Sequence, residues 1–212
     1  QQLNGQYFRV EKPLTQEILL EHLEGKQTVG AYQLSENSMV KYLCFDFDPE
    51  KLSSPEASVK QLLAILFEIK EEDDGRKRPR IWPNSVMLEA SRYPDPSFHL
   101  WIFFEPELNA KVAQWLGYRT LELANLRPNT IEIFPKQTEL TKDRAYGNFV
   151  KLPLGIHQVK KKWSRILDKT TFEPLPSSEL HKFCGISFSD SDIARIESFK
   201  DKKHVQTAFA VP

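Results

Sequence analysis

The most constraining feature of this chain is an apolar stretch, Tyr42-Leu43-Cys44-Phe45, that runs into two alternating acids, Asp46-Phe47-Asp48. Successive side chains of a β-strand point to opposite faces, so the two acids share one face and the two phenylalanines share the other. Carboxylates held this close resist joint ionisation unless a cation lies between them. Carboxylate oxygens favour Mg²⁺ or Mn²⁺, often together with substrate phosphates. A solvated turn before Pro49 is the alternative interpretation.

Length and composition describe an ordinary globular chain. Its 212 residues suffice for one large domain or two small modules with a buried core. The 29 basic and 29 acidic residues cancel, so no overall field indicates a polyanionic partner. The basic residues are concentrated locally, however, because eight Lys or Arg and only two acids lie between Lys136 and Arg165. Such a basic face can bind phosphates although the net charge is zero.

Cysteine content and hydropathy indicate where the chain works. Cys44 and Cys184 are too few for a zinc cluster and lack paired motif spacing, so we expect reduced thiols of an intracellular protein. No apolar run approaches the ~20 residues that span a bilayer, so no membrane partner is expected. The start Gln1-Gln2-Leu3 lacks Met and shows no charged-then-apolar leader. We therefore expect a cytoplasmic chain, with a piece of a longer protein as an open alternative.

Hydrophobic periodicity and capping signals predict alternating strands and helices. Strands are expected at 29–34, 39–48, 86–91, 98–104, 131–134, 149–152 and 171–173. Helices are expected at 15–23, 55–72, 108–125 and 189–199, the first capped by Thr15 and the last opened by Ser189 and Asp192. The segment 73–80 predicts a charged, exposed loop. This alternation indicates an α/β or α+β fold.

The strand expected at 98–104 adds a hydroxyl and an imidazole. Ser97 and His99 share one face, and the opposite, core-facing set is Phe98, Leu100, Ile102 and Phe104. Beside a carboxylate–metal site, a serine hydroxyl and an imidazole offer donors to triphosphate oxygens. A purely structural histidine is the alternative interpretation of His99.

A third acid, Glu132, lies between Ile131 and Ile133. Its strand is expected to bury one face and to present Glu132 on the other. Beside Asp46 and Asp48 it would complete a site for two divalent ions, which nucleotidyl transfer needs. An exposed glutamate on an edge strand is the alternative.

The basic segment contains two further candidates. Gly147 and Asn148 suit a turn into a strand on which Lys151 lies far enough along to face the same cleft. The run Lys160-Lys161-Lys162-Trp163-Ser164-Arg165 combines positive charge with one aromatic ring. It is either a track for nucleic-acid phosphates with a stacking ring or an ordinary solvated surface.

The order of these motifs along the chain resembles that of the archaeo-eukaryotic primase superfamily of primase-polymerases. The motifs are the paired acids, then the Ser-x-His segment, then the acid between apolar residues. The resemblance covers roughly residues 28 to 160 and is closest to the branch of prokaryotic conflict-system and CRISPR-associated primase-polymerases. The matching motifs are Gly30-Ala31-Tyr32, Phe45–Asp48, Ser91-Arg92, His99-Leu100-Trp101-Ile102-Phe103-Phe104, Phe134-Pro135-Lys136-Gln137 and Gly147-Asn148 with Leu152-Pro153-Leu154.

The resemblance implies a single catalytic core over residues 1–212, built of an α/β module and an RRM-like module with the active site in the cleft between them. It matches Asp46, Asp48 and Glu132 to the metal carboxylates, and Ser97 and His99 to the residues that meet the incoming nucleotide's phosphates. The turn Tyr93–Pro96 departs from the pattern, since relatives typically approach the histidine through a shorter Ser-Gly-type segment. Glu132 stands where many relatives have Asp.

We therefore predict a template-dependent nucleotidyltransferase that synthesises or extends nucleic-acid strands with two Mg²⁺ or Mn²⁺ ions. The predicted partners are a DNA template and primer, with RNA as an alternative, NTP or dNTP substrates, and flanking domains or conflict-system proteins. The alternatives are an end-joining or gap-filling polymerase without priming activity, an idle nucleic-acid-binding module, and a metal phosphatase or nuclease. The predicted nucleotide contacts are Ser97, His99, Lys151, Arg92, Lys136, Gln137, Asn148 and His157, and the predicted nucleic-acid contacts are Lys160, Lys161, Lys162 and Arg165.

Overall fold

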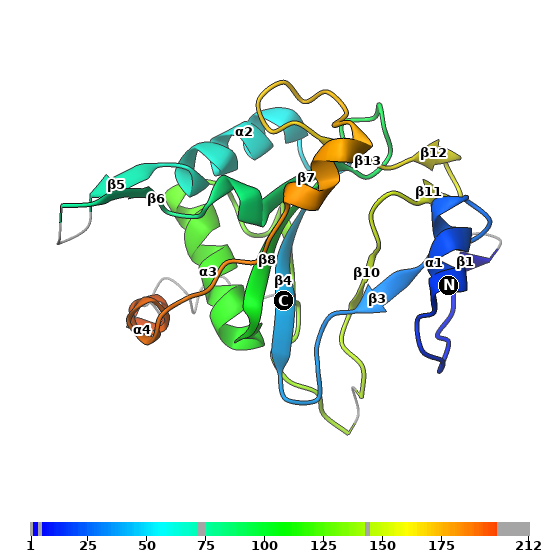
Figure 1. The fold of residues 1–212 in the computed structure, drawn as a ribbon, viewed down its shortest axis with the longest axis horizontal. Coiled ribbons are helices and arrows are strands. Elements are labelled where there is room, and N and C mark those ends of the chain that lie inside the picture. Colours follow the sequence, from blue (N-terminus) through cyan, green and yellow to red (C-terminus); the bar gives the residue numbers. More distant parts are fainter. Residues whose placement is uncertain (1, 4–5, 72–74, 143–144, 199–212) are drawn as a thin grey trace.

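The computed structural model describes residues 2–3, 6–71, 75–142 and 145–198, and its centre is a five-stranded antiparallel sheet (Figure 1). In spatial order the strands are β13 (Arg165–Leu167), β7 (Val86–Ala90), β8 (Phe98–Asn109), β4 (Met39–Phe47) and β9 (Glu132–Phe134). Helices and strands mix along the chain, which confirms the predicted α/β class.

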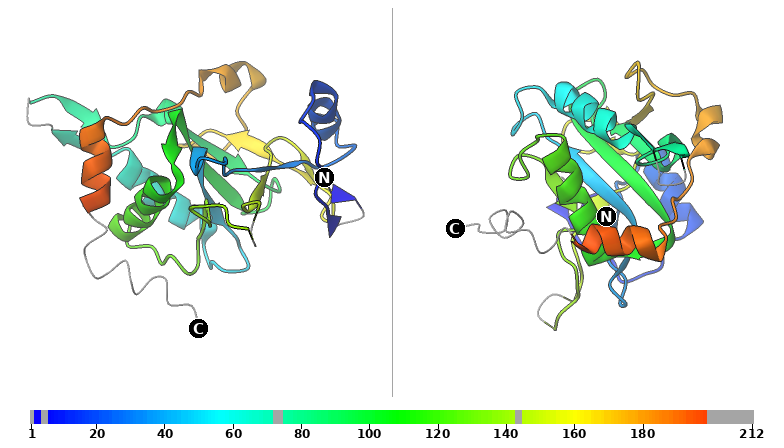
Figure 2. Two further views of the ribbon diagram at one scale, coloured as in Figure 1. Left: turned by 90° about the horizontal axis from the view of Figure 1, so that it is seen from below. Right: turned by 90° about the vertical axis from the view of Figure 1, so that its left-hand side faces the viewer.

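Two helices, α2 (Pro55–Leu66) and α3 (Ala110–Leu123), cover one face of this sheet (Figure 2). Alternate residues of the strands point to them, so Phe45, Leu88 and Leu100 are fully buried in the main core. Gly117 lets α3 approach closely, because a Cβ there would lie 2.9 Å from Ile133 Cγ2. A late helix, α4 (Asp190–Ser198), packs against α3.

The other face of the sheet is covered differently. A two-stranded ribbon of β3 (Gly30–Tyr32) and β10 (Phe149–Lys151) lies over it, and Val150 joins Cys44, Met87, Trp101 and Ile166 in a second, smaller core. In Figure 1 the helix α1 (Gln16–Leu23) lies beyond this ribbon, on the side away from β4. The short pair β11 (Ile156–His157) and β12 (Lys162–Trp163) follows β10.

The capping predictions are confirmed. The Thr15 hydroxyl accepts a hydrogen bond from Ile18 N. Ser189 and Asp192 form the reciprocal bonds expected at the start of α4. These side chains satisfy backbone N–H groups that a helix start leaves without partners.

Three predicted elements need correction. The helix expected at 55–72 ends at Leu66, and Ile69, which is 60% exposed, opens the strand β5 (Ile69–Glu71) instead. That strand pairs with β6 (Lys77–Pro79), so part of the expected charged loop is a hairpin, whose residues 72–74 lie outside the described part. Residues 171–173 form no strand; β13 occupies the sheet edge, and Leu167 only bridges to Pro174.

The remaining elements are small. They are β1 (Gln2–Leu3), which pairs with β2 (Gln6–Tyr7), and the 3₁₀ turns η1 (Pro83–Ser85) and η2 (Ser177–Lys182). Residue 199, the predicted end of the last helix, lies outside the described residues. Within the described ranges, every helix is too short or too polar to cross a bilayer. The division into two modules stays a prediction.

Candidate active site

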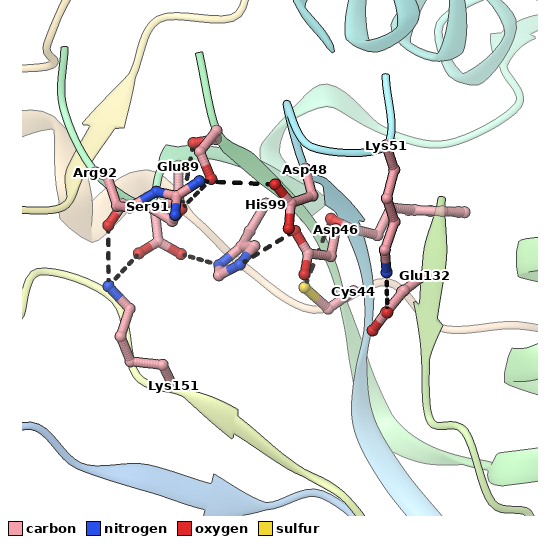
Figure 3. Close-up of polar contacts among 12 residues, drawn as sticks. Cys44, Asp46, Asp48, Lys51, Glu89, Ser91, Arg92, His99, Glu132 and Lys151 are labelled. Atoms are coloured by element: carbon pink, nitrogen blue, oxygen red, sulfur yellow. Dashed lines mark hydrogen bonds and ion pairs between the residues drawn. The ribbon is translucent and has the colours of Figure 1, made fainter. Parts of the chain in front are cut away.

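Four polar side chains form a row across the sheet on the face opposite the helices (Figure 3). The strand register makes Asp46 the partner of both Glu132 and His99, and makes His99 the partner of Glu89. The row therefore runs Glu132, Asp46, His99, Glu89 over β9, β4, β8 and β7. Each neighbour of these residues along its strand points to the helices, so strand alternation places all four on one face.

Asp46 occupies the middle of this row. Its Oδ1 lies 3.7 Å from His99 Nε2, and its side chain is 27% exposed. Burial raises the pKa of the Asp46 carboxyl, and the nearby Glu132 and Asp48 raise it further, while His99 acts against this. A carboxylate in such surroundings is stabilised by a cation, so the donor chemistry at Asp46 fits Mg²⁺ or Mn²⁺.

Asp48 lies one residue past the end of β4, beside Asp46 (Figure 3). Its Oδ1 accepts a hydrogen bond from Glu50 N at 3.0 Å and lies 3.7 Å from an Nη of Arg92. Arg92 follows β7, so it reaches the acids from the opposite side of the row. The predicted pair of acids therefore shares one side of the sheet, with a guanidinium close by.

Glu132 is paired with two lysines in this structure. Its carboxylate pairs with the ammonium groups of Lys51 and Lys136, the latter at 2.6 Å. Burial alone would raise the pKa of Glu132, but these two lysines hold it below its ordinary value. Among the described residues, no group of three or more His, Cys, Asp or Glu side chains is arranged to hold a metal ion. Glu132 must exchange its lysine partners before it can join Asp46 at an ion, and the three-acid site stays a prediction.

Glu89, at the other end of the row, was not predicted as a site residue. Its side chain is fully buried, and Oε2 accepts hydrogen bonds from His99 Nδ1 and Trp101 Nε1, both at 3.0 Å. Burial acts to raise the pKa of Glu89, but His99 and Lys151 hold it below its ordinary value. The signal in the sequence was an acid at the fourth position of the otherwise apolar Val86–Ala90.

Lys151 reaches the row from the ribbon rather than from the sheet. Its Nζ donates to Ser91 O at 3.1 Å and lies 3.9 Å from Glu89 Oε1, and its side chain is only 9% exposed. The half-buried His157 lies near, since burial, Arg92 and Lys151 together lower its pKa. Arg92, Lys151 and His157 thus lie near one another, and Lys151 adjoins the Glu89 end of the row; their nucleotide-binding role stays a prediction.

The other predicted nucleotide contacts lie outside the row itself, although Lys136 pairs with its member Glu132. Ser97 is buried, and its hydroxyl lies 2.7 Å from the Ser91 hydroxyl. Lys136 pairs with Glu132 and lies over the Phe134 ring. Gln137 is half-buried beside Gly147, and Asn148 is exposed before β10. These side chains border the site without a hydrogen bond to Asp46, His99 or Glu89 among those observed.

The predicted nucleic-acid residues have mixed surroundings. Lys160, Lys161 and Arg165 are exposed, whereas Lys162 pairs with Asp95. Trp163 is half-buried and packs on Gly25, where a Cβ would come within 2.8 Å of the indole. Lys160 and Lys161 are therefore accessible from solvent and Lys162 is engaged, while the indole packs against the end of α1.

Fold and site define a class: an α/β domain that carries acids and a histidine on the face of an antiparallel sheet opposite its helices. The family model "TOTE conflict system, Archaeo-Eukaryotic Primase domain" matches residues 7–182, so the chain belongs to this family. The match confirms the resemblance expected from the sequence and gives the domain the general character of a primase-polymerase-like nucleotidyltransferase. A comparison with curated proteins gave no match.

Proposed function

We propose that this domain is a template-dependent nucleotidyltransferase that synthesises or extends nucleic-acid strands on DNA. The observation that supports this most is the row itself, in which Asp46, an acid whose pKa is raised, and the partly buried His99 lie side by side at 3.7 Å. An acid meant to stay ionised beside other acids needs a cation, and a histidine beside it offers a donor for phosphate. Family membership supplies the reaction class.

Asp46 and Asp48 would hold the divalent ions, and Glu132 would join them on leaving Lys51 and Lys136. Such ions, Mg²⁺ or Mn²⁺, neutralise phosphate charge and make the primer 3′-hydroxyl a better nucleophile. Before binding, Lys51 and Lys136 neutralise Glu132, so the empty site does not suffer the full repulsion of three acids. We infer that these lysines release Glu132 when substrate and ions enter.

The other half of the row would hold the triphosphate. His99, Lys151 and Arg92 supply three cationic or donor groups, which lie beside the carboxylates of Asp46, Glu89 and Asp48 respectively. Charge-assisted hydrogen bonds of this kind contribute ~1.5–3 kcal/mol each. His157 is a further candidate, since it lies close to both Lys151 and Arg92.

The exposed lysines 160 and 161, with Arg165 on β13, would follow the template or primer backbone. We further propose that the domain works in the cytoplasm, with conflict-system partners or flanking domains, in line with the family description. Whether the substrates are NTPs or dNTPs is part of the test below.

The deciding experiment is extension of a labelled primer on a single-stranded DNA template, and on an RNA template, with NTPs or dNTPs and Mg²⁺ or Mn²⁺. The same mixtures without primer measure priming. We expect extension that Asp46→Asn abolishes. An extending enzyme that never primes would be the gap-filling alternative, and a protein that binds template without extending under any condition would be an idle binding module.

A further inference from the structure

We propose that Glu89 is a positioning residue that orients His99 and Lys151 toward the phosphates of the bound nucleotide. This inference rests on the proposed function, because it assigns His99 and Lys151 to the triphosphate. Glu89 itself is fully buried and cannot touch the substrate from its place in β7. It would act through the two side chains that it holds.

Burying the Glu89 carboxylate costs free energy, because the charge loses its hydration. A fully buried carboxylate is stable only when it is paired and hydrogen-bonded, and an apolar side chain would serve the second core at least as well. Its neighbours in that core include Met87 and Trp101. The strand therefore places a charge where packing alone would not require one.

One oxygen of Glu89 fixes the orientation of His99. Trp101 Nε1 can only donate, so Oε2 accepts from it, and the same oxygen must accept from His99 Nδ1. Nδ1 then carries a proton, and Nε2 is turned toward Asp46. The Trp101 indole meets the imidazole edge-on with ring centroids 5.8 Å apart, which restricts rotation of the ring.

The second oxygen faces Lys151. Glu89 Oε1 lies 3.9 Å from Lys151 Nζ, and the buried Ser164 side chain, by a hydrogen bond, also helps to lower the pKa of Glu89. The ammonium donates one proton to Ser91 O and keeps other donors for a ligand. Because Lys151 comes from the ribbon, this attraction holds the ribbon's cation over the sheet. One buried carboxylate thus fixes donors that come from two separate sheets.

A double-mutant cycle separates positioning from packing. Glu89→Met removes both acceptors at similar volume, and Glu89→Gln keeps an acceptor for His99 and Trp101 while losing the charge that faces Lys151. We expect Glu89→Met to weaken binding of ATP and dATP tenfold or more and to lower kcat, and Glu89→Gln to have a smaller effect. In a His99→Ala background, Glu89→Met should cost clearly less than in the wild type, because part of its effect acts through His99.

Leu88→Ala is the matched control. Leu88 is the residue before Glu89 in β7, is equally buried, and points to the helices instead. It should lower the melting temperature at least as much as Glu89→Met and leave nucleotide affinity in the folded protein nearly unchanged. If the two variants lose affinity in proportion to their loss of stability, Glu89 is only structural and the proposal is overturned.

Ring ¹⁵N spectra of His99 in the metal-free protein give a readout that does not depend on activity. In the wild type and in Glu89→Gln, Nδ1 should carry a proton, and in Glu89→Met this preference should be lost. Identical His99 signals in all three would overturn the positioning role. A wild type that neither binds nucleotide nor extends primers would instead refute the proposed function, while these spectra would still decide whether Glu89 orients His99.

Discussion

Asp46 and Glu132 are register partners on β4 and β9, yet their carboxylates have different side-chain partners. Asp46 faces Nε2 of His99, whereas Glu132 pairs with Lys51 and Lys136. The backbone thus already brings the two acids together, and the lysine pairs of Glu132 are what must change before both acids can share an ion. This relationship leads to the first two predictions.

Replacing Asp46 by Asn, or Asp48 by Asn, should abolish primer extension while the protein keeps its fold. Since burial and neighbouring acids raise the pKa of Asp46, removing its charge relieves repulsion, and the free energy of unfolding should stay within about 1 kcal/mol of wild type. Extension assays with Mn²⁺ and denaturant titrations measure both effects. Near-native extension by either variant would contradict the metal role.

Lys51→Met should increase the affinity of the nucleotide-free protein for Mn²⁺, followed by electron paramagnetic resonance. The variant removes a cation that competes with the metal for Glu132. A partly exposed ion pair contributes ~0.2–1 kcal/mol, so the gain should reach up to about fivefold. Lys41→Met is the matched control, because Lys41 pairs with Glu107 away from the row. An unchanged Mn²⁺ affinity would exclude Glu132 from the metal site.

Neutralising lysines 160, 161 and 162 together to Gln should weaken single-stranded template binding and flatten its salt dependence. Three lost phosphate contacts lower the slope of log affinity against log salt by about 2 for a single strand. Most of the effect should come from the first two, since Lys162 already pairs with Asp95. Lys60→Gln with Lys111→Gln, on the helices α2 and α3, is the control. If the slope of log affinity against log salt were the same in both variants, lysines 160–162 would be an ordinary solvated surface rather than a phosphate-binding segment.

Trp163→Ala should lower stability rather than template affinity. The indole packs on Gly25 at the end of α1, and truncating a large, partly buried aromatic side chain of this kind costs about 2 kcal/mol. Thermal unfolding and single-strand binding, measured on the same preparation, separate the two roles. Weaker binding at unchanged melting temperature would instead show that the ring stacks on a base.

Acidification should destabilise the fold through His22. This side chain is buried, with Nδ1 accepting from Val29 N and Nε2 bonded to Pro153 O, and burial lowers its pKa. An unfolded histidine takes up its proton near pH ~6.5, so below that pH the unfolded state binds more protons and stability falls until the folded pKa is reached. The loss is ~1.4 kcal/mol per unit of pKa difference.

Denaturant titrations at several pH values between neutral and mildly acidic check this expectation. His22→Gln should be less stable than wild type at neutral pH and should lose less stability on acidification. Parallel pH profiles of the two proteins would mean that another group controls the acid sensitivity.

Strand alternation made part of the site predictable. Once residues 39–48 and 98–104 were recognised as strands, the common face of Asp46 and Asp48 followed from parity, and the core-facing set from Phe98 to Phe104 is confirmed. The register that makes Asp46 and His99 partners was not predictable, because it depends on how two distant strands pair. The family resemblance, rather than the periodicity, connected them.

Glu89 was missed for a related reason. From a single sequence, an acid within a short apolar strand is expected to be exposed to solvent. Glu89 is buried because β7 lies between β8 and β13 in the sheet and β10 packs over this face. The helix end at Leu66 was also misjudged, since Ile69 continues the helical spacing but lies in a solvent-exposed hairpin. In α1 the buried residue is His22, while Leu19, Leu20 and Leu23 are exposed.

The polar row crosses four neighbouring strands of the sheet, so β9, β4, β8 and β7 each contribute one residue to it, and none of its four residues lies in a loop. The row therefore does not depend on the lengths of the loops. A shift of one residue within a strand, however, would move its side chain to the other face of the sheet. Deleting one residue of β4 before Asp46 would point the Asp46 side chain into the core between the sheet and the helices. Lengthening the turn Tyr93–Pro96 would leave His99 in place. When related sequences are aligned, each site residue should therefore be matched to a strand position that faces the same side of the sheet. The number of residues between motifs says little about whether the site is intact.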